Sequence, residues 1–172
     1  MEINLGKAGK VGLIFFGLGA FLFIVGFSIA DWVTLSTDDS EYQAGLWRYC
    51  EESLCRRVFN PAFKFFGKTL PAWFRGTQAL ACLALMAIIG DVIIRALFVF
   101  RNGPKWYLFA SIGLDVATAV LAIFAAAVFG SHIEDTKSTE MSLSWGYALD
   151  IIGGVLMICA AGFFFAESRN HF

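Results

Sequence analysis

Four long apolar segments, almost free of charged residues, set the strongest limit on how this 172-residue chain folds. They are Val11–Ala30, Gly76–Ile94 with Asp91, Trp106–Gly130 with Asp115, and Met141–Ala166 with Asp150. A helix needs roughly 20 apolar residues to cross the ~30 Å hydrocarbon core of a bilayer. Only helices and closed barrels satisfy the backbone in that core, and these continuous runs lack the alternation of a barrel. The sequence predicts four transmembrane helices, at about residues 8–30, 75–100, 105–130 and 142–167.

Composition agrees with lipid as the solvent. Hydrophobic residues make up 58% of the chain and charged residues only 16%, against about 25% charged in soluble domains. The formal net charge of -1 argues against nucleic acid as a partner. The first segment also has the outline of a secretory signal, with Lys7 and Lys10 before an apolar run that ends in small residues. Because that run exceeds the ~7–15 residues of a signal core, we favour a retained helix.

The loops predict the orientation. Lys7 and Lys10 precede the first segment, and Arg101 and Lys105 lie between the second and third, whereas the loop at 131–141 is mainly acidic. By the positive-inside rule, both termini are cytoplasmic and the loops at about 31–74 and 131–141 face outward. We expect one domain over residues 1–172, located at the plasma membrane.

The first outward loop is the only extramembrane region large enough to fold. Trp32–Leu35, Gly45–Cys50 and the run from Arg57 are rich in β-branched and aromatic residues, and Asp38–Ser40 is a turn signal. These runs predict a small antiparallel sheet in this loop. Residues 62–73 carry aromatic side chains between lysines, which fits either a short amphipathic helix at the membrane surface or a loop packed on the sheet.

The cysteines divide between two environments. Cys50 and Cys55 lie in the outward loop, an oxidising setting, and a tight hairpin across the residues between them brings their β-carbons within bridging range. We expect a disulfide there. Cys82 and Cys159 lie within apolar segments and are expected to be small packing residues.

Three aspartates interrupt the apolar segments. Asp91 and Arg95 have the i, i+4 spacing of a local ion pair, and we expect Arg95 to extend toward the nearby membrane boundary. Asp150 is expected to reach water or the outward loop. Asp115 lies ~14 Å along its helix, near the bilayer middle, with no basic residue evident at that level. It is a candidate intramembrane polar site, for which interhelical hydrogen bonding is favoured over an ion or proton pathway.

Small residues repeat along the third segment with a spacing that permits close helix approach, and packing within one bundle is favoured over a dimer interface. They are Gly113, Ala117, Ala122, Ala126 and Gly130. Catalysis finds little support, because the two histidines lie far apart and no zinc spacing, phosphate loop or nucleophile elbow occurs. No enzyme activity and no cofactor or metal is expected.

Taken together, the four spans and the pattern Trp32…Gly45-Leu46-Trp47…Cys50…Cys55 resemble the claudin, epithelial membrane protein and peripheral myelin protein superfamily. Arg75, at the start of the second span, is similar to an arginine that claudins carry there. The resemblance implies a left-handed bundle of four transmembrane helices with an extracellular sheet of about five short strands, one supplied by the third loop. The motif residues are expected to build this ectodomain and not, by themselves, to bind a ligand.

Two functions follow from the resemblance. The first is a claudin-like protein of cell–cell junctions, adhesion or membrane organisation, which assembles laterally with itself or with another claudin-like protein in cis or in trans. Its charged loop residues would set contact and ion preference; they include Asp38, Asp39, Glu51, Glu52, Arg56 and Arg57. The alternative is an auxiliary, gamma-type subunit of an ion channel or receptor. The first loop is shorter than in most gamma-type relatives, which favours the first function.

Overall fold

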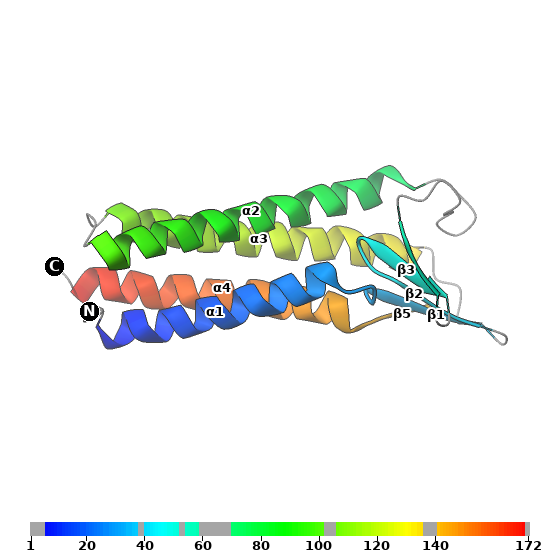
Figure 1. Ribbon diagram of the computed structural model, residues 1–172, viewed down its shortest axis with the longest axis horizontal. Helices are drawn as coiled ribbons and strands as arrows, with labels where there is room; N and C mark the ends of the chain where they lie inside the picture. Colours follow the sequence, from blue (N-terminus) through cyan, green and yellow to red (C-terminus); the bar gives the residue numbers. More distant parts are fainter. Residues whose placement is uncertain are drawn as a thin grey trace.

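The computed structural model describes residues 6–37, 40–51, 54–58, 70–101, 106–135 and 141–170. The elements in chain order are α1 (Lys7–Ser28), β1 (Val33–Thr37), β2 (Ser40–Ala44), β3 (Arg48–Glu51), β4 (Leu54–Arg57), α2 (Ala72–Arg101), α3 (Trp106–Asp135), β5 (Met141–Leu143) and α4 (Trp145–Asn170). Four helices run side by side, with both ends of the chain at one end of the bundle and the sheet at the other (Figure 1).

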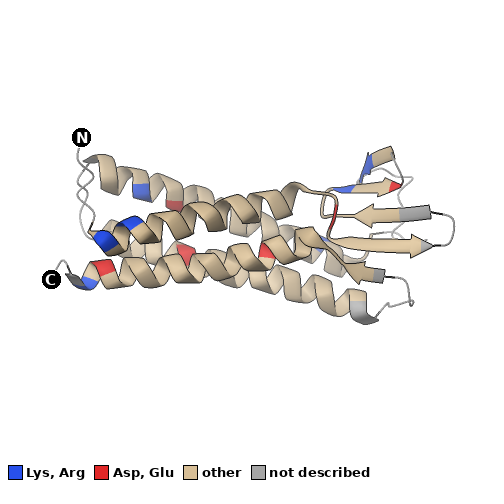
Figure 2. Cartoon of the chain, turned by 90° about the horizontal axis from the view of Figure 1, so that it is seen from below, with Lys and Arg blue, Asp and Glu red and all other residues tan. Residues whose placement is uncertain are grey.

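The four expected helices are all present and are long and apolar enough to cross a membrane. Figure 2 shows that most of their length is free of charge, with a few charged positions inside the bundle. α2 and α3 have 30 residues each, or ~45 Å at 1.5 Å per residue, which exceeds a ~30 Å hydrocarbon core. Both therefore extend beyond the membrane, and α3 continues past the predicted end near residue 130.

Glycines bring α1 and α4 close together. A Cβ placed on Gly19 would lie 3.1 Å from the carbonyl oxygen of Gly153, and one on Gly153 would lie 3.0 Å from the carbonyl oxygen of Gly19. Nearer the sheet, a Cβ on Gly26 would lie 2.8 Å from the carbonyl oxygen of Gly146. These backbone approaches allow extensive contact between α1 and α4, whereas α1 and α2 barely touch.

The centre of the bundle is filled by side chains from all four helices. The buried cluster consists of Phe16, Ala20, Phe23, Ala84, Ile88, Ala119, Ala122, Met157 and Ala160. The small residues of the third segment serve this packing in part. Ala122 and Ala126 are buried, whereas Gly113 faces outward with nothing within 4 Å of the place where a Cβ would lie.

The sheet has five antiparallel strands in the order β4-β3-β2-β1-β5. As expected, the last strand comes from the third loop, since Met141–Leu143 pairs with β1. Two details were predicted wrongly. Ser40, assigned to a turn, begins β2, and Gly45-Leu46-Trp47, assigned to a strand, form the bend between β2 and β3. The turn residues Asp38 and Asp39, and most of the segment at 62–73, lie outside the described residues.

Candidate functional site

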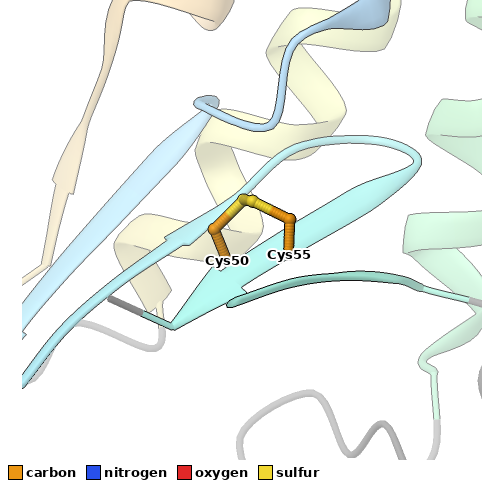
Figure 3. Close-up of a disulfide and its surroundings, with 2 residues drawn as sticks. All are labelled: Cys50 and Cys55. Carbon is orange, nitrogen blue, oxygen red and sulfur yellow. A yellow bond between two sulfur atoms is a disulfide. The ribbon is translucent and has the colours of Figure 1, made fainter. Parts of the chain in front are cut away.

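The two cysteines of the motif join β3 to β4. Cys50 and Cys55 are register partners in this antiparallel pair, and their sulfur atoms form the expected disulfide (Figure 3). Cys50 is buried and Cys55 is exposed. The bond fixes the outermost hairpin of the sheet, which is a five-stranded layer too small to be stable without attachment to the bundle.

Trp32 attaches the sheet to the helices. Its side chain is fully buried, and its indole Nε1 donates a 2.7 Å hydrogen bond to the carbonyl oxygen of Gly26. This carbonyl is one of the last four of α1, which have no partner within the helix. The ring packs edge-on against Phe129 of α3 and Tyr147 of α4. Trp32 therefore caps one helix while it contacts two others.

Gly45 permits the closest approach between the sheet and the end of α1. A Cβ at this position would overlap the carbonyl oxygen of Ile29 and lie 2.7 Å from Cα of Ala30. Both obstacles are backbone atoms, so neither can rotate away. The amide of Gly45 donates to the carbonyl oxygen of Arg48 at 2.9 Å and closes the bend that the motif forms.

Leu46 and Trp47 complete the attachment. Leu46 is fully buried, and its carbonyl oxygen accepts a 2.6 Å hydrogen bond from Nε2 of Gln78 on α2. Trp47 is half-buried and lies 5.1 Å from Phe27 of α1, measured between ring centres. The sheet is thus held to α1 and α2 by the bend and to α3 and α4 by Trp32. We refer to Trp32, Gly45, Leu46 and Trp47 as the anchor.

Beyond the anchor, the β3–β4 hairpin presents an exposed surface. Besides Cys55, its exposed side chains are Arg48, Glu51, Leu54, Arg56 and Arg57. β4 is an edge strand, with one side of its backbone unpaired in the sheet. Arg48 and Arg57 are register partners, and like charges directly opposite each other destabilise a strand pair. In the part of the chain that the structure describes, no salt bridge engages these arginines. We refer to these five residues as the basic edge.

The remaining residues singled out from the sequence are separate from both groups. Arg75 is exposed in the first turns of α2. Its place at the helix N-terminus contributes nothing to capping, because cations are disfavoured at that end. Asp38, Asp39 and Glu52 lie outside the described residues, so Glu51 is the acidic member of the predicted contact surface that the structure places.

Asp91, Arg95 and Asp115 form one intramembrane cluster, and this corrects two expectations. Arg95 does not extend to the membrane boundary: it is only 7% exposed and pairs with Asp91 at 2.8 Å and with Asp115 of α3 at 2.5 Å. Asp115 therefore has a basic partner after all. Ser111 donates its hydroxyl to the other carboxylate oxygen of Asp91. The guanidinium carbon of Arg95 also lies 4.2 Å from the ring centre of Phe16 and 3.8 Å from that of Phe164.

Arg95 consequently contacts all four helices. The two aspartates come from α2 and α3, and the two aromatic rings come from α1 and α4. The sequence missed the Arg95–Asp115 pair, although a signal was available. α2 and α3 form an antiparallel hairpin, and Arg95 and Asp115 lie six and nine residues from its two inner ends. The long arginine side chain bridges that difference of ~5 Å.

Asp150 is also placed differently from its prediction. It is fully buried and does not reach water, and among the described residues neither carboxylate oxygen has a hydrogen-bond partner. At the opposite end of α4, Glu167 accepts hydrogen bonds from the amides of Gly6 and Gly9 at 2.7 and 3.0 Å. This carboxylate satisfies amides at the N-terminus of α1, where negative charge is favoured.

Other reactive side chains do not converge. Cys82 and Cys159 are unpaired and half-buried, and the ring of His132 stacks on Trp73 with 5.0 Å between ring centres. The described residues contain no group of three potential metal ligands. His171 lies outside the described residues.

Four transmembrane helices that carry a disulfide-bonded five-stranded sheet at one end define a multi-pass membrane protein of the claudin-like class. The model of the PMP-22/EMP/MP20/Claudin family matches residues 10–165, and the chain belongs to this family. The predicted fold and family are thereby confirmed. A comparison with curated protein sequences found no match. The family is one of non-catalytic membrane proteins.

Proposed function

We propose that this chain is a plasma-membrane protein of cell–cell junctions or membrane organisation, with cytoplasmic termini and an extracellular sheet, that acts through contacts and not as an enzyme. Lys7 and Lys10 precede the first helix, whereas the segment at 131–141 is mainly acidic, and this contrast supports the orientation. The anchor supports a fixed position for the extracellular sheet, because its side chains pack against the helices of the bundle.

The basic edge is the observation that carries the functional part. Two arginines face each other across β3 and β4 without an ion-pair partner among the described residues. That arrangement weakens the hairpin, so the fold itself does not require it. An unpaired strand edge beside it offers backbone donors and acceptors to a further protein chain. Both features suit a surface that meets an acidic segment of a neighbouring copy or of another claudin-like protein.

Expression in non-adherent cells tests the proposal. Cells that express the protein should aggregate and concentrate it where they touch. Replacing Arg48 and Arg57 together by glutamate reverses the charge of the basic edge and should abolish that concentration while surface expression is retained. Arg169→Glu is the matched control, because Arg169 is also exposed but lies at the end of α4 away from the sheet.

Two results would contradict different parts of the proposal, the junction role and the assignment of its contact surface. One is uniform distribution of the wild-type protein over the cell surface. The other is retained contact enrichment in the Arg48→Glu/Arg57→Glu variant, which would show that the basic edge is not the contact surface. Co-purification of one channel or receptor without contact enrichment would instead support the auxiliary-subunit alternative.

A further inference from the structure

A small cavity lies beside the intramembrane cluster, toward the end of the bundle that carries the termini. Its lining comes from all four helices: Leu13 of α1, Arg95, Phe98 and Val99 of α2, Tyr107, Leu108 and Ser111 of α3, and Phe164 of α4. The space open to the centre of a water-sized sphere is about 10 Å³. One buried water needs about 10–15 Å³ by this measure and two or more polar partners.

The lining of that cavity is mostly apolar, and Arg95, Tyr107 and Ser111 are its polar residues. Nη1 of Arg95 is buried and has no hydrogen-bond partner among the described residues. The hydroxyl of Ser111 donates to Asp91 and so still has lone pairs that can accept. A water that accepts from Arg95 and donates to Ser111 would satisfy both, whereas an empty space would leave a buried charged donor unpaired.

The charges of the cluster do not balance. Asp91 and Asp115 share one guanidinium, so two ionised carboxylates would leave a net charge of -1. Among the described residues no second cation pairs with the cluster, and α1 and α4 present the rings of Phe16 and Phe164 to Arg95. Glu167, the nearest acid on α4, is occupied by the amides of α1. A buried uncompensated charge is costly in lipid.

One oxygen of the cluster can take a proton without losing an existing hydrogen bond. Both oxygens of Asp91 and Oδ2 of Asp115 already accept, whereas Oδ1 of Asp115 has no partner among the described residues. We propose that the cavity holds a water and that the cluster is a proton-binding site, with the proton carried on Oδ1 of Asp115. The step is addition of one proton to the Asp115 carboxylate, which brings the cluster to zero net charge and breaks no other bond.

We expect the site to bind a proton without conducting one. Beyond Asp115, toward the sheet, the centre of the bundle is mainly apolar, with Thr118 and Asp150 as buried polar residues. We therefore expect the proton to exchange with water at the end of the bundle that carries both chain termini, which we place in the cytoplasm. This role is independent of the junction proposal, since it involves no residue of the anchor or the basic edge.

Infrared spectroscopy of the full-length protein in lipid nanodiscs tests the inference. The wild-type spectrum at neutral pH should contain a carbonyl band of a protonated carboxyl group that is lost in Asp115→Asn. Because Asp150 is also buried, Asp150→Asn is the matched control and should leave that band in place. In D₂O the band should shift, since water reaches the site. Ser111→Val, which fills the cavity and removes the hydroxyl, should slow that shift.

The proton site and the water are tested by different results. A wild-type carboxyl region that matches that of Asp115→Asn would overturn the proton site, and a band that never shifts in D₂O would overturn the water. If Asp115→Asn does not fold, carbon-13 NMR of wild-type protein labelled at aspartate carboxyls decides the matter. A signal for a protonated aspartate that is retained in Asp150→Asn supports the site, and carboxylate signals alone overturn it.

Discussion

Replacement of Trp32 by phenylalanine is the sharpest test of how the sheet is attached. The change removes the indole N–H and leaves the carbonyl oxygen of Gly26 buried without its partner, at a cost of about 1–3 kcal/mol. Phenylalanine also has two fewer buried carbon atoms, which at about 0.8 kcal/mol per buried methylene adds roughly 1–2 kcal/mol. We expect the free energy of unfolding to fall by roughly 2–5 kcal/mol.

Trp145 provides the matched control. It lies at the start of α4 with 75% of its side chain exposed, so Trp145→Phe should change stability by no more than about 0.5 kcal/mol. Unfolding in mixed micelles, followed by helix circular dichroism, measures both variants. The rate at which a reductant opens the Cys50–Cys55 disulfide reports on the sheet alone and should rise only in Trp32→Phe. Equal stability of the two variants would refute the idea that Trp32 anchors the sheet.

Three further predictions concern the bend, the cluster and the disulfide. Gly45→Ala forces a Cβ into the backbone at the end of α1 and should prevent surface expression, whereas Gly76→Ala, placed in open space, should express normally. Arg95→Leu leaves the buried carboxyl groups of Asp91 and Asp115 without their cation and should lower stability in micelles by about 3–5 kcal/mol; adding Asp115→Leu should recover part of that loss, and a further loss would contradict the pairing. Cys50→Ser opens a ring with a sequence separation of 5 and should cost about 2 kcal/mol by loop-closure entropy, as measured by thermal unfolding.

The sequence predicts the membrane part well because hydrophobic length is a local property. Each helix begins and ends near the limits of an uninterrupted apolar run, as Trp106 at the start of α3 illustrates. The hairpin that carries Cys50 and Cys55 was also predicted from the sequence. Only four residues separate the two cysteines, and a tight hairpin brings them within bridging range. The fold class and the family therefore follow from pattern and motif alone.

What the sequence did not reveal depends on distant partners. β2 contains Ser40 and Tyr42 among polar residues, and it is a strand because β1 and β3 pair with it on either side. Gly45-Leu46-Trp47 has the composition of a strand, but its role as a bend is set by the end of α1 and by Gln78. The glycine contacts of α1 with α4 were missed because neither helix alone indicates which face meets the other.

The pairing of the first helix with the last has a consequence for how the protein is made. Synthesis proceeds from the N-terminus, so α1 enters the membrane before α4 exists, and α2 offers it almost no surface in the meantime. Until α4 is made, the amides of Gly6 and Gly9 lack their acceptor Glu167. The glycines of α1 likewise lack their packing partners Gly146 and Gly153. A nascent chain that has not completed its fourth helix therefore leaves its first helix without its main packing partner.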